Sequence, residues 1–504
     1  MAGISVSSAP RAAGAPGRGA PRGLALLYAL GVPLLAWPAL SNGYPLVFSD
    51  TGTYLSQAIH RYLGWDRPAF YSLFMLGLHW TVTTWPVVLA QAAIVVLMLE
   101  RTRAAFFPAV SDAWLLGVLA VLSTMTGLPW LASRLMPDVF TPLLVLALAL
   151  LILAPARLGR AGGWAMAAAA AAMTAVHQSH VLLAIGLIVV LLALRAALGL
   201  RGAGGEGLGR AGLARVLGVP AVALLALAAV NAAAHGRLSP SPFGGVFLLA
   251  RVLYDGPGMR TLERECPAAG WRLCAWVGRM PASSDAFLWA ADSPLNREGG
   301  AKRLAGEADA IVLATLRAEP WAQARAMLAN TWEQLTRFSP NDGMHAWAET
   351  VSPWIARDFP RFEQAAYAAA RQTRGEAVLP DWVERLDRAA ALAGVLGALA
   401  LFLRAWRAGG PEGGAGGRVG GGAAGRRGRA GLAGAGLAAC LLNAAITGGL
   451  SGPHDRYQSR VIWLPAAVVL LAVAEGGQAA AARAAHAWRA RVRAGGRMRR
   501  HAFA

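Results

Sequence analysis

Charged residues are scarce in this sequence of 504 residues, and acidic residues are the scarcer kind. Only 15% of the residues are charged, whereas soluble proteins have about 25%. Hydrophobic residues make up 56% of the chain, and the mean hydropathy is +0.45. A chain with so little charge is too apolar for a soluble protein of two domains, so the composition predicts a membrane protein.

Cysteine is also rare, because the chain has only three. Three cysteines are too few for a framework of disulfides. Cys266 and Cys274 lie in one long hydrophilic segment, where they either pair in an oxidising compartment or stay two unrelated thiols. Cys440 lies inside an apolar run, and we expect it to be a buried thiol.

Ten apolar runs are close to the length that a helix needs to cross a bilayer. These runs are residues 24–40, 82–99, 113–128, 139–154, 163–176, 181–199, 216–234, 389–403, 431–449 and 461–476. They predict an all-α, polytopic membrane protein of about ten transmembrane helices. The first run is either a retained helix or a signal-peptide core; no small-residue cleavage site follows it, so we expect a retained helix.

The excess of positive charge lies on one side of these ten runs. The segments on the side of the termini are residues 1–23, 100–112, 155–162, 200–215, 404–430 and 475–504. With Arg195 at the end of the sixth run, they hold 24 arginines against five acidic residues, which is +19 of the net +20. The positive-inside tendency makes this side cytoplasmic, with both termini on it. Because the excess of arginine is explained by the orientation of the protein in the membrane, we expect membrane lipids and no nucleic acid as partners.

The same pattern divides the chain into regions. We expect a disordered cytoplasmic tail (1–23), an N-terminal transmembrane module of about seven spans (24–234), a periplasmic helical domain (235–388), a C-terminal module of about three spans (389–476) that includes a cytoplasmic linker (404–430), and a basic cytoplasmic tail (477–504). In the first outer loop, residues 54–65 and 68–80 resemble two helices that lie along the membrane surface. The predicted location is a bacterial-type inner membrane.

Polar residues recur where the outer ends of the apolar runs lie. The first cluster is Ser49 to Tyr54, in which Asp50 is either a catalytic carboxylate or the cap of the first surface helix. Its neighbours Thr51 and Tyr54 are candidate substrate or metal contacts. Asp66, which lies beside Arg67, is a second candidate catalytic acid in the same loop.

Two further clusters precede the fourth and sixth runs. Arg134 is a candidate contact, and Asp138 either caps the following helix or takes part in catalysis or metal binding. His177 and His180 are three residues apart, so on a helix they share a face. They then hold a metal or a phosphate, or they are simply solvated.

The last outer turn, between the ninth and tenth runs, is unusually polar. Arg456 and Arg460 are four residues apart, which on a helix projects two guanidinium groups from one face, a geometry suited to phosphate. His454 and Tyr457 are candidate neighbours of the phosphate. The alternative is that the two arginines only snorkel to the membrane surface.

On these features the chain resembles the GT-C class of integral-membrane glycosyltransferases, which have many spans and an acidic residue in a structured first outer loop. The resemblance implies that Asp50 is the catalytic acid of that loop, and that Arg456 or Arg460 contacts the donor phosphate. It also implies a polyprenyl-phosphate sugar donor. The chain departs from the commonest pattern because Asp50 has no adjacent second acid, the nearest being Asp66. Whether a divalent metal is used stays open.

We therefore expect transfer of a sugar to an envelope glycan, lipid or protein acceptor on the periplasmic face. A carboxylate is needed to take the proton of the acceptor hydroxyl, and fixed cations to stabilise the departing phosphate. A transporter or flippase is the first alternative, although transporters usually hold polar residues at the membrane midplane. The second is a non-enzymatic assembly protein, which would not require Asp50 or Arg460.

The first prediction concerns topology. Reporter fusions at positions 205 and 415 should be cytoplasmic, and a fusion near position 300 should be outside, because arginine is concentrated on the side of the termini. Paired alkaline phosphatase and fluorescent protein fusions measure this. A cytoplasmic position 300 would contradict the predicted orientation of every site residue.

Overall fold

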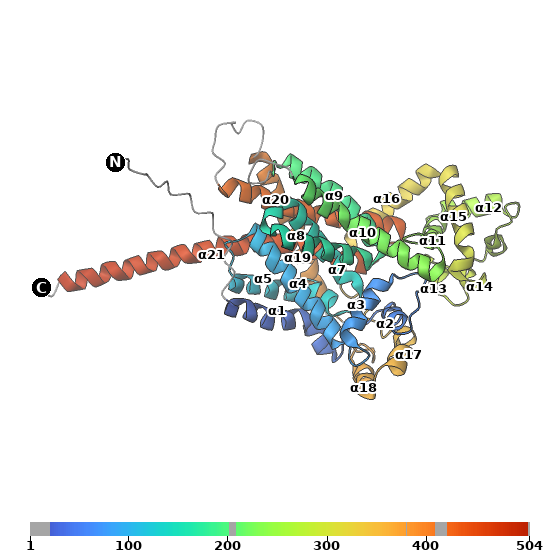
Figure 1. The fold of residues 1–504 in the computed structure, drawn as a ribbon, viewed down its shortest axis with the longest axis horizontal. Coiled ribbons are helices and arrows are strands. Elements are labelled where there is room, and N and C mark those ends of the chain that lie inside the picture. The colour runs from blue at the N-terminus through green and yellow to red at the C-terminus, as the bar shows by residue number, and fades with distance from the viewer. Residues whose placement is uncertain (1–20, 201–207, 378, 380, 409–420, 502–504) are drawn as a thin grey trace, which may run out of the picture.

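The computed structural model describes residues 21–200, 208–377, 379, 381–408 and 421–501. In these residues the chain is an all-α, polytopic membrane protein, with one isolated backbone bridge between Leu46 and Arg134 as its only β-type pairing. The bundle has two ends (Figure 1): the terminal end, where α1 begins and from which α21 extends, and the insert end, which carries α11 to α18. The fold class predicted from the sequence is confirmed.

Within the described residues, seven helices are long and apolar enough to cross a membrane. They are α1 (Pro21–Asn42), α4 (Trp85–Phe106), α9 (Gln178–Ala197), α10 (Gly209–His235), α19 (Asp381–Ala408), α20 (Gly421–Leu450) and α21 (Asp455–His501). The other three expected spans fall on the shorter helices α5 (Asp112–Met125), α7 (Phe140–Leu153) and α8 (Gly159–Ala175). Each of the ten apolar runs is thus helical, and seven of these helices have the length and composition of a full span.

The helix α7 shows why the length of a helix is a poor criterion for a membrane span in this protein. It has 14 residues, which rise about 21 Å, less than the hydrocarbon thickness of about 30 Å. All 14 residues are buried, and α7 packs against α4, α8, α9 and α20. Because α7 contacts protein on every side, lipid does not set its length.

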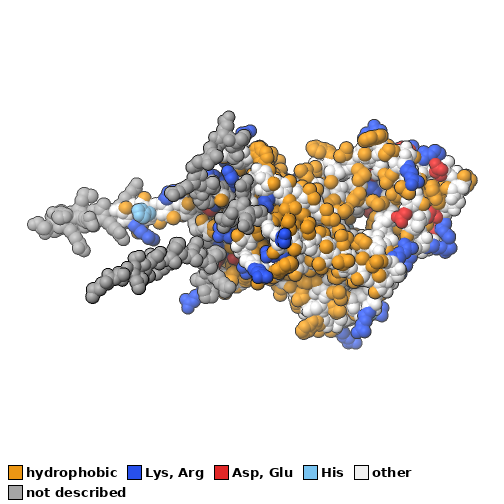
Figure 2. Space-filling view, turned by 45° about the horizontal axis from the view of Figure 1, so that its top comes forward, with side chains coloured by type: hydrophobic (Ala, Val, Ile, Leu, Met, Phe, Trp, Pro, Cys, Tyr) orange, Lys and Arg blue, Asp and Glu red, His pale blue; other side chains and the backbone are white. Residues whose placement is uncertain are grey.

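Hydrophobic side chains cover much of the bundle surface that Figure 2 shows, and the visible acidic side chains gather mainly over the insert end. At the terminal end, helices far apart in sequence meet. Arg429 donates to the Phe106 carbonyl (3.1 Å) and to the Glu475 carboxylate (2.7 Å). The apolar belt between two polar ends is the pattern of a protein that lies across a bilayer.

The loops at the insert end are helical too. The first loop forms α2 (Thr51–Ile59) and α3 (Ala69–His79), close to the two predicted surface helices. Two short helical turns, α6 (Leu128–Ser133) and η1 (Pro137–Val139), precede α7, and a third, η2 (Pro155–Arg157), follows it. The helices of the insert are α11 (Gly244–Tyr254), α12 (Pro257–Glu265), η3 (Arg272–Trp276), α13 (Ser284–Trp289), α14 (Pro294–Arg297), α15 (Gly300–Ala318), α16 (Pro320–Thr336), α17 (Ala348–Asp358) and α18 (Arg361–Ala369).

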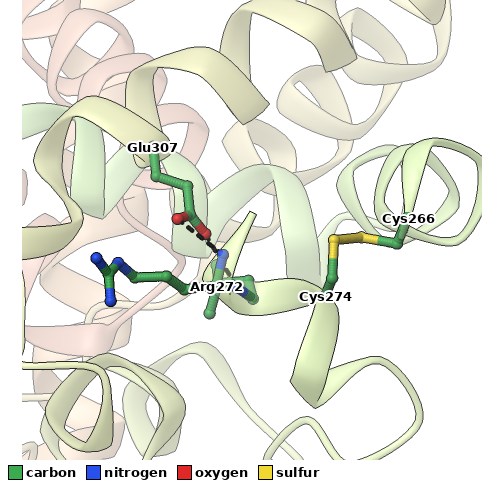
Figure 3. The surroundings of a disulfide bond; sticks show 5 residues. Cys266, Arg272, Cys274 and Glu307 are labelled. Carbon is green, nitrogen blue, oxygen red and sulfur yellow. Dashed lines mark hydrogen bonds between the residues drawn. A yellow bond between two sulfur atoms is a disulfide. The ribbon is translucent and has the colours of Figure 1, made fainter. Parts of the chain in front are cut away.

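The insert packs in two parts. Its first part, α11 to α15, has an apolar core of its own. Within it Cys266 and Cys274 form a disulfide, and Glu307 of α15 accepts hydrogen bonds from the backbone of Arg272 and Leu273 in the same loop (Figure 3). Its second part, α17 and α18, joins the core of the bundle, and α17 packs on α2.

Backbone contacts hold the segment that precedes α2. The Leu46 N–H donates to the Ser133 carbonyl (2.9 Å), and the Leu135 N–H donates to the Leu46 carbonyl (2.8 Å). The Gln372 side chain accepts from the Val47 N–H and donates to the Val47 carbonyl (2.9 and 2.8 Å). These bonds fix the start of α2 against the residues that precede α7.

The close packing of α2 on α17 gives a second prediction. Gly52 has no room for a side chain, because a Cβ there would collide with the Thr350 carbonyl and lie 2.7 Å from the Trp354 ring. Gly52→Ala should cost about 1 to 3 kcal/mol, the usual cost of overpacking. Thermal unfolding in detergent, followed by tryptophan fluorescence, measures the loss.

The matched control is Gly77→Ala in α3, where no atom lies within 4 Å of the new Cβ. Alanine is the better helix former, so this control should be neutral or slightly stabilising. Equal unfolding temperatures for the two variants would contradict the packing that places Asp50.

Candidate active site

Asp50 lies between two arginines that come from distant parts of the chain. Its Oδ1 accepts from Arg67 Nη2 at 2.8 Å, and its Oδ2 lies 3.5 Å from Arg456 Nη1. Asp50 is the N-cap residue of α2 by position, but its side chain makes no capping bond. The alternative that Asp50 serves as a helix cap is therefore wrong, because the carboxylate faces the arginines instead of the backbone.

The second carboxylate of this loop shares Arg67. Arg67 Nε lies 3.7 Å from Asp66 Oδ2. Burial raises the pKa of Asp50, but the charges of Arg67 and Arg456 outweigh burial and hold that pKa below its usual range. Burial raises the pKa of Asp66 above its usual range, although Arg67 opposes it, and the Asp50 charge raises it further. Two neighbouring carboxyls with pKa values shifted apart suit one to accept a proton and the other to hold one.

Asp138 and Arg460 form the innermost ion pair of the site. Asp138 Oδ1 lies 3.1 Å from Arg460 Nη1, and both side chains are buried. Arg460 also donates to Asn443 Oδ1 (3.1 and 2.9 Å) and to Ser179 Oγ (3.3 Å). Asp138 Oδ1 accepts from Arg460 and not from the backbone of α7, so the alternative that Asp138 caps the fourth apolar helix is wrong. Its Oδ2 is buried and has no hydrogen-bond partner among the described residues.

Stacked planar groups hold the arginines of α21. The guanidinium of Arg456 lies 4.1 Å from the centre of the Phe48 ring and 5.1 Å from that of the Tyr457 ring. Arg460 lies on the same Tyr457 ring, at 5.4 Å. The two arginines thus share one face of α21, as their spacing predicts. Only Arg456 reaches Asp50, because Arg460 is turned inward and fully buried.

Arg134 and Tyr54 complete the cluster. Arg134 Nη2 donates to the Asp342 carbonyl at 2.9 Å, and its buried Nε has no partner among the described residues. Tyr54 is buried, and within the described chain its hydroxyl has no hydrogen-bond partner. Burial raises the pKa of Tyr54, despite the nearby Arg67 charge, so its hydroxyl stays neutral. The cluster therefore presents unsatisfied donors and acceptors beside Asp50.

Three of the expected site residues have local structural roles instead. Thr51 Oγ1 donates to the Leu135 carbonyl (3.1 Å) and accepts from the Phe48 N–H (2.8 Å). His180 uses both ring nitrogens, on Thr141 Oγ1 and the Met173 carbonyl (2.7 Å each). His454 turns to Asp285 of the insert, 3.7 Å away. None of the three faces Asp50, so the positions of these residues in the sequence assigned too many of them to the site.

His177 caps α9, because its Nδ1 accepts from the Ser179 N–H at 3.2 Å. With both nitrogens of His180 also engaged, the expected pair of imidazoles is not arranged for a metal. Among the described residues no group of three His, Cys, Asp or Glu side chains could hold a metal ion. The carboxylates Asp50 and Asp138 face guanidinium groups, which repel a cation. These donors do not fit a divalent metal, and no step below uses one.

Sequence reasoning missed several residues of the cluster. Arg67 was noticed beside Asp66 but not assigned a role, although it makes the shortest ion pair with Asp50. Asn443 gave a signal, since a buried amide in an apolar run needs a partner. Phe48 and Asp342 gave none, because nothing in their local sequence shows that they meet Arg456 and Arg134.

Comparison with known proteins adds no identification: no protein-family model, curated protein or solved structure matches this chain. The function proposed below therefore rests on the geometry of the cluster.

The shifted pKa of Asp66 gives a third prediction. A carboxyl with a raised pKa in the folded state favours folding below the pKa of the unfolded chain, about 3.9, and loses that contribution as pH rises. Asp66→Asn removes the ionisable group, so this variant should gain thermal stability relative to the wild type as pH rises from about 3 to about 7, a range that begins below the unfolded pKa. Unfolding temperatures at a series of pH values measure the gain.

Asp292→Asn is the control, since Asp292 is exposed in the insert. It should follow the wild type at every pH. A stability gain for Asp66→Asn that is largest at the acidic end of the series would contradict the direction of the shift.

Proposed function

We propose that the protein is an integral-membrane glycosyltransferase of the GT-C type, in the inner membrane of a bacterium. It moves a sugar from a polyprenyl-phosphate donor to an envelope glycan, lipid or protein acceptor on the periplasmic face. The observation that carries this proposal is Asp50, an ionised carboxylate held between Arg67 and Arg456 at one end of a membrane bundle. A base and fixed cations side by side are what sugar transfer from a phosphate requires.

The proposed step uses the residues as follows. The acceptor hydroxyl oxygen attacks the anomeric carbon of the donor, and its proton passes to Asp50. The bond between that carbon and the phosphate oxygen breaks, and its electron pair leaves with the lipid phosphate. Arg456 stabilises the charge that develops on the phosphate, because a guanidinium forms charge-assisted hydrogen bonds with phosphate oxygens. The Tyr54 hydroxyl is free to donate to a sugar or phosphate oxygen.

The position of the charges supports transfer over transport. Asp50 precedes α2, Asp138 lies just before α7, and Arg456 lies in the first turn of α21. All three belong to the insert end, whereas a transporter typically binds its substrate near the middle of the membrane. Within the proposal, the insert end faces the periplasm and the arginine-rich terminal end faces the cytoplasm, in keeping with the positive-inside tendency.

A lipid analysis tests the activity. Cells that lack the protein should accumulate a polyprenyl-phosphate sugar and lose one sugar from an envelope glycan, lipid or protein, as mass spectrometry of extracts would show. The accumulated donor should be oxidised by periodate added outside spheroplasts, because transfer occurs after the donor has reached the periplasmic face. Accumulation on the protected, cytoplasmic side would instead indicate a flippase. Unchanged lipid-linked sugars and envelope glycans would contradict both.

A fourth prediction separates catalysis from charge pairing. Asp50→Asn should lower transfer about 100-fold or more, the usual effect of removing a general base. This change also leaves Arg67 and Arg456 short of a carboxylate in a buried place, which destabilises folded proteins. The double variant Asp50→Asn, Arg67→Gln removes one charge of each sign and should recover much of the unfolding temperature.

The double variant should nevertheless stay inactive, because it still lacks the base. Complementation of the deletion strain and thermal unfolding of the purified variants measure the two effects separately. Asp292→Asn, the exposed control, should complement fully. Restored transfer in the double variant would falsify the catalytic role of Asp50 and leave it a structural ion pair.

A further inference from the structure

Among the described residues, Arg134 is the one arginine of the four in the cluster that has no carboxylate within 4 Å. Arg67, Arg456 and Arg460 each form an ion pair with Asp50 or Asp138. Within the described part of the chain, Arg134 has two polar contacts, the Asp342 carbonyl and the Met344 sulfur at 3.9 Å. It is only 5% exposed. A buried charge with no opposite charge in contact is costly, so an anion that binds against Arg134 would relieve that cost.

The backbone around Arg134 is fixed. The bridge to Leu46 holds its main chain on both sides, and the buried Gln91 side chain donates to its carbonyl at 2.9 Å. Its guanidinium lies 5.7 Å from the centre of the Phe48 ring, the ring on which Arg456 also stacks. Arg134 and Arg456 are thus positioned against one aromatic ring before any ligand binds, which lowers the entropic cost of binding.

A loop of the insert covers these two arginines. Residues 339–347 contribute Asp342, whose carbonyl accepts from Arg134 and whose carboxylate accepts from the Arg456 N–H at 2.8 Å. Gly343 lies so close to Phe48 that a Cβ would collide with its ring. Burial lowers the pKa of Arg134, and the negative charge of Asp342 opposes this shift. Asp342 is therefore an internal anionic group placed over the arginine pair.

We propose that Arg134 and Arg456 together bind the phosphate of the lipid donor, and that Asp342 occupies this anion site when no donor is bound. This inference rests on the proposed function and names the binding residues within it. It moves the phosphate contact from Arg460 to Arg134. The reason is that Arg460 already donates to Asp138, Asn443 and Ser179, whereas the buried Nε of Arg134 has no acceptor among the described residues.

The site takes one phosphate group and not two. Arg134 is the one guanidinium of the cluster with no carboxylate within 4 Å among the described residues, and the other three already lie against Asp50 or Asp138. A second phosphate would have to lie against these carboxylates, and like charges at close range repel. The donor class is therefore a polyprenyl monophosphate sugar.

Binding of short prenyl phosphates to the purified full-length protein in detergent tests the inference. Farnesyl phosphate should raise the unfolding temperature and bind at least tenfold more tightly than farnesyl diphosphate. Arg134→Gln should weaken farnesyl phosphate binding about 10- to 100-fold, the usual range for loss of a hydrogen bond to a charged group. Arg134→Lys keeps the positive charge but lacks the planar, forked guanidinium, so its affinity for farnesyl phosphate should lie between those of the wild type and Arg134→Gln. Arg297→Gln, on the exposed surface of the insert, is the matched control and should bind as the wild type does.

Asp342→Asn provides the second variant, which does not depend on the folding of Arg134→Gln. It removes the internal carboxylate and should strengthen farnesyl phosphate binding several-fold. Wild-type affinity in Arg134→Gln, weaker binding in Asp342→Asn, or a preference for the diphosphate would overturn the inference while leaving the proposed transferase intact. No binding of either prenyl phosphate to the wild type would contradict the proposed lipid-phosphate donor itself.

Discussion

The ion pairs of Asp50 with Arg67 and Arg456 constrain the whole insert end of the bundle. Each of these side chains is at most 14% exposed, and removing a charge from water costs several kcal/mol unless a partner compensates it. Arg67 is 17 residues from Asp50, whereas Arg456 is 406 residues away. The first loop and the last spanning helix therefore cannot separate without leaving buried charges unpaired. Folding of this end and assembly of the cluster are one event.

The insert reaches the same cluster through the first turn of α21. Gln334 of α16 accepts from the His454 N–H and donates to the His454 carbonyl (2.9 and 2.8 Å). Asp455 accepts from the Ser339 N–H, and Asp342 accepts from the Arg456 N–H (2.9 and 2.8 Å). A displacement of the insert would thus move the backbone that carries Arg456. Within the proposed function, an acceptor that binds the insert would therefore also affect the position of Arg456 in the phosphate site.

Sequence alone predicted the all-α membrane fold, because apolar length and arginine distribution are local signals. It also singled out Asp50 and Arg456, since charges at the ends of apolar runs are conspicuous. It could not tell that Arg460 is turned inward, because spacing gives the face of a helix but not the partner on another helix, here Asn443. The spacing of His177 and His180 misled for a similar reason, as each ring is engaged by groups close to it in the fold.

The two arginines of α21 show how one helix face can carry two different functions. Arg460 is held by hydrogen bonds, which use its donors and leave it a structural role. Arg456 stacks on Phe48 and Tyr457, and stacking uses the faces of the guanidinium, so that its edge keeps N–H groups besides the one that faces Asp50. A cation that must bind a ligand and still stay in place is better fixed by aromatic rings than by carboxylates. Phe48, just two residues before Asp50, therefore links the position of the proposed base to that of the proposed phosphate site.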